Sequence, residues 1–147
     1  MSDAAHMRRA LALAAPMIGR TGPNPAVGCV IVKDGVVVGE AATGAGGRPH
    51  AEEQALAQAG CNTRGAHVYV TLEPCARRSV GAASCSDLLI QAGIACVLFA
   101  ASDPHPLAAG AGPARLRAAG VAAELGPMQA EARAQNAAFF AAWEKEP

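Results

Sequence analysis

Three residues of types that bind metal ions stand in short, well-defined segments of this sequence. His50 lies in PHAEE at 49–53, Cys75 ends TLEPC at 71–75, and nine residues separate Cys75 from Cys85. Catalytic zinc in proteins takes three protein ligands and leaves a fourth place for water, and one imidazole with two thiolates is a known set. The pattern therefore predicts a zinc site formed by His50, Cys75 and Cys85.

The residues next to these ligands favour hydrolysis. Glu52 lies two residues after His50, in the first turn of a predicted helix, so both side chains can point toward the same open end. A glutamate there could reach water on the metal without binding the ion. Cys85 begins another predicted helix, where backbone N–H groups and the helix dipole stabilise a thiolate. We expect Glu52 to carry the protons and Glu53 to be a solvated charge.

Turn signals and hydrophobic periodicity indicate the elements that position these residues. A first apolar stripe at helical spacing runs from Met7 to Ile18. An Asp-Gly pair at 34–35 between two β-branched runs predicts a hairpin. Predicted strands cover 27–32, 36–41, 66–72, 94–100 and 121–125, and further helices cover 51–60, 86–93, about 107–119 and 127–143.

The order of these elements predicts the fold class. Strands and helices alternate through the second half, which implies right-handed crossovers between parallel strands. With the antiparallel hairpin, the five strands form a mixed sheet covered on both faces. We therefore expect an α/β protein with a three-layer α/β/α arrangement, a five-stranded mixed sheet and a single domain over residues 1–147.

Composition and charge exclude several classes of protein. Twelve basic residues balance 12 acidic ones and only five side chains are aromatic. This disfavours a nucleic-acid partner, because such binding needs basic charge and single strands stack on aromatic rings. No run approaches the ~18 apolar residues of a membrane span. The odd number of cysteines predicts reduced thiols and a cytoplasmic protein. Arg8 and Arg9 before an alanine-rich run also fit a short signal peptide, but the first helix explains that segment fully.

The motifs resemble those of the zinc-dependent cytidine-deaminase superfamily, whose signature is H-x-E followed by P-C-x-x-C. The longer spacing between the cysteines here is similar to that of the deaminase domain of the bifunctional riboflavin-biosynthesis deaminase-reductase. The same likeness extends over TGPNPAVGCVIV (21–32), GGRPHAE (46–52), GAHVYVTLEPC (65–75), the DPHP turn with AGAG after it, and NAAFF (136–140). The resemblance implies a cytidine-deaminase-like fold, a Zn²⁺ cofactor, hydrolytic deamination of a small aminopyrimidine-type substrate, and a homodimer.

Substrate contacts follow from the same resemblance. The amide of Asn24 would hydrogen-bond the ring or ribose of the substrate, and Thr43 would help to shape the pocket. Between the cysteines the family carries Ser-His-x-Gly-(Arg/Lys)-Thr-Pro-Pro, whereas this chain has the one-residue-longer ARRSVGAAS. Arg77 and Arg78 are expected to replace the missing basic side chains as phosphate contacts, because a guanidinium offers paired donors. His105, where the family has asparagine, is a candidate for the pocket rim.

Several alternatives stay open at this stage. The metal site could be purely structural, in a catalytically silent zinc-binding partner subunit. Asn24 could be only a turn residue, Arg77 and Arg78 could be solvated loop charges, and Glu73 is expected to be a hydrogen-bond acceptor rather than a catalyst. The riboflavin precursor, a phosphoribosylamino-pyrimidinone, is the first candidate substrate. Another free base, nucleoside or pterin-like amine is the alternative, and nucleic-acid editing is third. Because the sequence stops after NAAFF, a stand-alone deaminase is expected.

Overall fold

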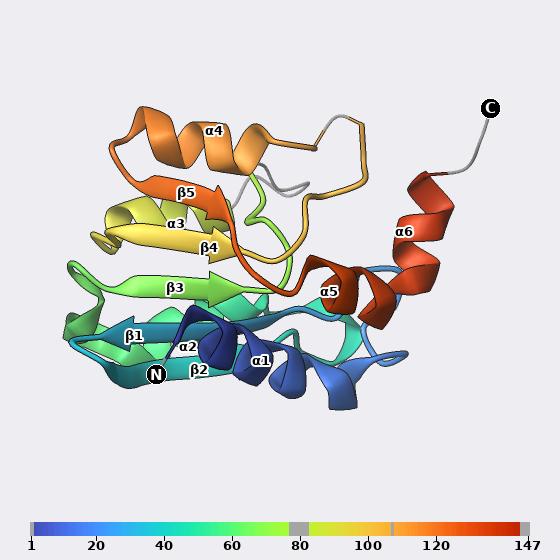
Figure 1. The fold of residues 1–147 in the computed structure, drawn as a ribbon, viewed down its shortest axis with the longest axis horizontal. Coiled ribbons are helices and arrows are strands. Elements are labelled where there is room, and N and C mark those ends of the chain that lie inside the picture. Colours follow the sequence, from blue (N-terminus) through green and yellow to red (C-terminus); the bar gives the residue numbers. More distant parts are fainter. Residues whose placement is uncertain (1, 77–82, 107, 145–147) are drawn as a thin grey trace.

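A five-stranded mixed sheet forms the centre of the computed structural model, which describes residues 2–76, 83–106 and 108–144 (Figure 1). The sheet has the order β2-β1-β3-β4-β5. β1 pairs antiparallel with β2 and β3, whereas β3, β4 and β5 run parallel. The predicted mixed sheet is thereby confirmed. The strands are β1 (Gly28–Lys33), β2 (Val36–Ala42), β3 (His67–Val70), β4 (Cys96–Phe99) and β5 (Ala122–Leu125).

Helices cover both faces of this sheet, which confirms the three-layer arrangement. In Figure 1, α1 lies in front of β1 and β2, and α2 and α3 lie behind the sheet. α4 packs on α3 and β5, as expected when two successive parallel crossovers share one hand. The helices are α1 (Asp3–Ala14), α2 (Ala51–Ala59), α3 (Cys85–Gln91), α4 (Ala111–Ala118), α5 (Gln129–Gln135) and α6 (Ala137–Trp143), and short 3₁₀ turns are η1 (Ala15–Met17), η2 (Ala45–Gly47) and η3 (Gly60–Thr63).

The hairpin between β1 and β2 forms where the sequence predicts it. Asp34 and Gly35 adopt positive φ angles of 51° and 78°, the backbone conformation of a type I′ turn. Every residue of β1 except Lys33 is buried, because α1 covers one face of this strand and α2 the other. Within the described part of the chain, no helix combines the length and apolar character needed to cross a bilayer.

The first helix is shorter than its apolar stripe suggests. α1 ends at Ala14, and Pro16 lies in the 3₁₀ turn that follows. Proline lacks the N–H that an α-helix requires. Ile18, which was expected to extend the buried stripe, lies beyond the helix and is 42% exposed.

The predicted helix over 127–143 is in fact two helices. α5 and α6 meet at Asn136, whose φ of −115° and ψ of 42° are not helical. The side chain of Asn136 accepts a hydrogen bond from Ala26 N–H (3.0 Å) and donates one to Ala26 C=O (2.8 Å). This pair fixes the break and ties the C-terminal helices to the loop before β1. The helix predicted over about 107–119 also begins later, at Ala111.

Candidate metal centre and catalytic pocket

Two of the predicted ligands stand at the starts of helices. His50 is the N-cap of α2, and its backbone N–H donates to Oε1 of Glu53 (3.0 Å). Cys85 is the first residue of α3, directly after the N-cap Ser84. Glu53, which was expected to be a solvated charge, therefore closes the cap that holds the His50 backbone in place. The two helix starts lie close together, because Nδ1 of His50 approaches Sγ of Cys85.

The side chains of His50, Cys75 and Cys85 come together in one group. Their ligand atoms all lie within 4.8 Å of one another. Nδ1 of His50 is 3.2 Å from Sγ of Cys85, and the backbone N–H of Cys85 donates to Sγ of Cys75 at 3.3 Å. Zinc ligands at 2.0–2.3 Å and tetrahedral angles lie roughly 3.3–3.8 Å apart. The donor set and its spacing therefore fit one zinc ion.

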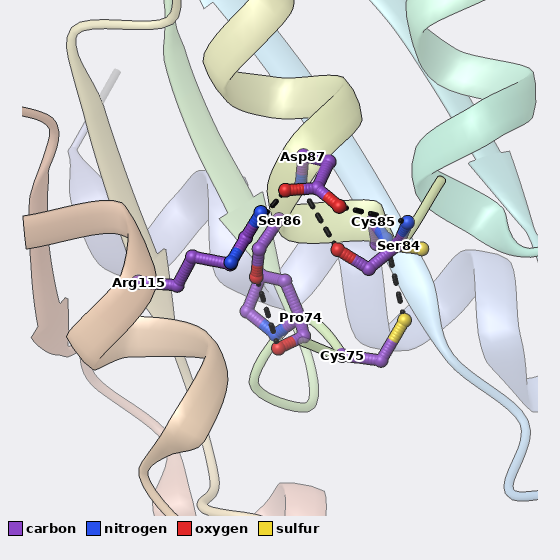
Figure 2. A network of polar contacts seen from close by, with 7 residues as sticks. All are labelled: Pro74, Cys75, Ser84, Cys85, Ser86, Asp87 and Arg115. Atoms are coloured by element: carbon purple, nitrogen blue, oxygen red, sulfur yellow. Dashed lines mark hydrogen bonds and ion pairs between the residues drawn. The ribbon is translucent and has the colours of Figure 1, made fainter. Parts of the chain in front are cut away.

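A network of hydrogen bonds holds the segment that carries Cys75 against the start of α3 (Figure 2). The backbone N–H of Ser86 donates to the carbonyl of Cys75 (3.0 Å), and the Ser86 hydroxyl lies 3.4 Å from the carbonyl of Pro74. Ser84 Oγ accepts from the backbone N–H of Asp87 (3.1 Å). The Asp87 carboxylate pairs with Arg115 of α4. The start of α3 and the Arg115 side chain of α4 thus brace the segment that carries Cys75.

Helix α4 approaches this segment unusually closely at Gly112. A Cβ atom built on Gly112 would lie 1.7 Å from the carbonyl oxygen of Pro74 and 3.0 Å from Oγ of Ser86. Only a residue without a side chain fits there. The backbone of α4 therefore supports the turn that precedes Cys75.

The electrostatic environment separates a buried acid from a stabilised thiolate. Glu52 is only 5% exposed, and burial raises its pKa to about 7, offset in part by a backbone hydrogen bond. Hydrogen bonding from Cys85, and then from His50, lowers the pKa of Cys75 to about 4. A thiolate is the form that binds metal. A carboxyl group with a pKa near neutrality is typical of groups that exchange protons during catalysis.

A cavity of about 390 Å³ opens in front of these residues. This volume lies in the range of small-molecule sites. Cys85 is fully buried behind it. The cavity is lined by Pro23, Asn24, Pro25, Val27, Thr43, Gly47, His50, Glu52, Leu72, Glu73, Cys75, Asp103, His105, Ala108, Phe139 and Trp143.

Two predicted substrate contacts reach this cavity. Asn24 lines it, with its Nδ2 so close to Gly47 that a Cβ there would lie 2.3 Å away. Thr43 also lines it, but its hydroxyl accepts a hydrogen bond from Val27 N–H (2.9 Å). Arg77 and Arg78 fall outside the described residues.

The residues around Glu73 and His105 agree with the sequence expectations. Glu73 is buried, and its Oε1 accepts a hydrogen bond from Gly110 N–H (2.9 Å). It thus holds the loop before α4. His105, the candidate for the pocket rim, lines the cavity.

Sequence reasoning missed Asp103, Phe139 and Trp143 as parts of the cavity wall. Asp103 lies in the DPHP turn, of which only His105 was considered for the pocket, and Phe139 lies in NAAFF, which was noted without a role. Trp143 is the only tryptophan of the chain and is 46% exposed. An isolated large aromatic residue on an alanine-rich helix was the available signal.

Comparison with protein families and sequences gives a consistent match. Residues 1–101 match the model described as the cytidine and deoxycytidylate deaminase zinc-binding region. The riboflavin biosynthesis protein RibD of Escherichia coli is 48% identical over 140 residues, which are 95% of this chain and 38% of that protein. The diaminohydroxyphosphoribosylamino-pyrimidine deaminase of Buchnera aphidicola is 39% identical, with 95% of both chains covered.

Solved structures agree with these sequence matches. RibD of Acinetobacter baumannii superposes with a TM-score of 0.93 at 42% identity, over 97% of this chain and 40% of that one. The Rib2 deaminase of Aspergillus oryzae shares the fold, with a TM-score of 0.75 at 22% identity and 94% and 92% of the two chains covered. The chain thus spans about two fifths of the length of the RibD proteins that it matches.

Proposed function

Because the chain belongs to the cytidine and deoxycytidylate deaminase zinc-binding family, we propose that it catalyses the zinc-dependent hydrolytic deamination of a small aminopyrimidine. The first candidate substrate is the riboflavin precursor diaminohydroxyphosphoribosylaminopyrimidine, which gives the Buchnera relative its name. Residues 1–147 then act as one deaminase domain.

One observation carries this proposal. A group of one imidazole and two thiols, with ligand atoms within 4.8 Å of one another, stands beside a buried carboxyl group at a cavity large enough for a heterocycle. We assign His50, Cys75 and Cys85 as the zinc ligands and Glu52 as the catalytic residue. In the described residues the metal group has three members, as expected of a catalytic rather than a structural zinc site.

The reaction needs a proton carrier in contact with both water and the substrate. When bound, zinc supplies Lewis-acid activation of a water molecule. Glu52 would accept a proton from the attacking water as the water oxygen bonds to the amine-bearing ring carbon, and would then return protons to the ring nitrogen and to the departing amine. The carbon–nitrogen bond breaks, a carbonyl forms and ammonia leaves, so that water supplies the oxygen and the two hydrogens added.

The remaining predicted residues are assigned to substrate binding. Asn24 and Thr43 line the cavity beside the metal group, so they can contact the ring or a group attached to it. We keep Arg77 and Arg78 as proposed phosphate contacts on sequence grounds. In the sequence they lie between the two cysteines, two and three residues after Cys75.

A second candidate substrate class is favoured by the charges of the cavity. Among the described residues, the ionisable side chains that line it are carboxylates, histidines and Cys75, with no lysine or arginine. A phosphate therefore gains no lysine or arginine partner from this part of the wall. A free base, nucleoside or pterin-like amine without phosphate is the alternative substrate.

We further propose a cytoplasmic homodimer that acts on small molecules and not on nucleic acid. The equal numbers of acidic and basic residues and the few aromatic rings support the small-molecule preference. The five cysteines are free thiols in the structure, which supports a reducing compartment.

A screen of amine-bearing rings tests the proposed function. The zinc-loaded chain is incubated with aminopyrimidines as free bases, ribosyl compounds and phosphoribosyl compounds, and with aminopurines and pterins, and ammonia is measured. We expect release from at least one aminopyrimidine. Release of ammonia from none of them by fully zinc-loaded protein would favour the catalytically silent subunit instead.

A further inference from the structure

The outer wall of the cavity is built by the C-terminal helix α6, far from the metal group in sequence. Phe139 and Trp143 of this helix and His105 of the DPHP turn line the same cavity as His50 and Glu52. The rings of His105 and Trp143 pack against each other with centroids 4.2 Å apart and planes tilted by 50°. The single tryptophan of the chain therefore has a defined neighbour at the pocket.

This wall has a fixed place in the fold. Asn136 anchors the start of α6 to the backbone of Ala26 through two hydrogen bonds. The next turn is held by Phe140, which is buried and packs edge-on against Phe139 and under the guanidinium of Arg133. Trp143 follows one turn later. A helix held at its start presents its last turn in a reproducible position.

Trp143 itself forms a thin partition rather than part of the core. Together with Phe139 it borders the catalytic cavity and also a second hollow of about 720 Å³, which is lined by residues of the 18–25 segment and of α5 and α6. The indole is nearly half exposed. Truncating it would join two open spaces and remove little buried surface, so the fold should survive.

The position of this wall indicates what it contacts. The amine-bearing carbon of the substrate has to lie near Glu52 and the metal group, so the substituent that projects from the ring meets other parts of the lining, to which Phe139, Trp143 and His105 belong. The described part of the wall contributes aromatic surface and the His105 imidazole, and no lysine or arginine. Aromatic surface suits the apolar face of a sugar and offers nothing to a phosphate.

We propose that Trp143, supported by His105, is a specificity-determining residue that packs against the sugar substituent of the substrate ring. This inference rests on the proposed function, because it places the reacting amine at Glu52. The Trp143 contact should distinguish sugar-bearing aminopyrimidines from free bases. Recognition of the sugar would then be separate from recognition of the phosphate.

Kinetics of Trp143→Ala test the proposal against three matched compounds: the aminopyrimidine as free base, its ribosyl form and its phosphoribosyl form. The loss of one aromatic contact should raise KM about 2- to 10-fold for the two sugar-bearing compounds equally, with kcat unchanged, as expected for an interaction of equal strength in ground and transition states. KM for the free base should not change. Trp143→Phe should recover most of the loss.

Two controls separate this role from a structural one. Val36→Ala truncates another exposed apolar side chain, 61% exposed in β2, which does not line the cavity, and it should leave all constants unchanged. If His105 acts only by supporting Trp143, the double variant His105→Ala/Trp143→Ala should be no worse than Trp143→Ala alone. Additive losses would contradict that support.

Binding gives an independent readout, because Trp143 is the only tryptophan. Titration of the zinc-loaded Glu52→Gln variant with the ribosyl compound should change the tryptophan emission to saturation, and the free base should change it less. Equal changes with both compounds, or equal KM effects of Trp143→Ala on both, would overturn the sugar subsite. Failure of the proposed function would look different: the wild-type chain would release no ammonia from any compound, and the emission test would still decide about the subsite.

Discussion

The two walls of the catalytic cavity are built in different ways. The inner wall, which carries His50, Cys75 and Cys85, is formed by helix starts and is braced by hydrogen bonds to backbone atoms. The outer wall, formed by α6 and the DPHP turn, depends on one anchoring side chain and on ring packing, and its last large residue is nearly half exposed. Reaction chemistry needs positions fixed within a fraction of an ångström, whereas binding tolerates a looser surface.

This difference predicts that changes in the inner wall abolish the reaction and that changes in the outer wall alter substrate affinity. Variants of the two walls therefore test this difference. The expected effects decrease from the ligands outward.

Cys85→Ser should have the largest effect. The replacement removes a thiolate from a fully buried position, so we expect loss of zinc and, with it, of all ammonia release. Cys61→Ser changes an exposed cysteine and should keep both the bound zinc and the release of ammonia. Metal analysis and the ammonia assay on the two variants measure this. Retention of stoichiometric zinc by the Cys85 variant would refute the assignment of this ligand.

Gly112→Ala should damage the inner wall from behind. The added methyl group would lie 1.7 Å from the carbonyl of Pro74, so α4 or the turn before Cys75 must move. We expect a loss of about 1–3 kcal/mol in the free energy of unfolding together with weaker zinc binding. Ala114→Ser, on the exposed face of the same helix, is the matched control. Urea unfolding measures the stability, and titration with a zinc chelator measures the zinc affinity. Unchanged values of both would contradict the importance of this close approach.

Asn136→Ala should loosen the outer wall. It removes two hydrogen bonds to Ala26, which corresponds to about 1–3 kcal/mol of stability. Without these bonds, α6 and the loop that precedes β1 should both shift. The KM for the substrate should therefore rise, and the zinc content should match that of the wild type. Gln129→Ala, an exposed change on α5, serves for comparison. A loss of zinc in the Asn136 variant would mean that the two walls are not independent.

Glu40→Gln should have the smallest effect, since it lies outside both walls. The Arg9 guanidinium beside Glu40 lowers the pKa of that carboxyl below its ordinary value of 4.5. A lowered pKa stabilises the folded chain above the ordinary value, and this stability is lost as the pH falls through the folded value. The wild type should thus be slightly more stable than the variant at pH 7, and the difference should shrink as the pH falls below 4.5. A difference that persists in acid would point to another cause.

The inner wall could be predicted from the sequence because its signals are local. His50 with Glu52, Pro74 with Cys75, and the helix that begins at Cys85 each lie within a few residues, and metal-ligand chemistry restricts the residue types strongly. The Asp-Gly hairpin and the parallel strands followed in the same way from short-range patterns.

The outer wall could not be predicted because it depends on contacts between distant segments. The break at Asn136 is held by its bonds to Ala26, 110 residues earlier, and the alanine-rich sequence around it gives no strong stop signal. Trp143 reaches the cavity only after that break has turned α6. Tertiary contacts of this kind override local helix propensity.

The Glu52→Gln variant tests most directly whether a buried carboxyl group moves protons beside a bound metal. Zinc content and ammonia release are measured on the same preparation. We predict about one zinc ion per chain, as in the wild type, and a turnover that is lower by about 10²- to 10⁴-fold. Full activity of the glutamine variant, or loss of its zinc, would contradict the assignment of Glu52 as the proton carrier.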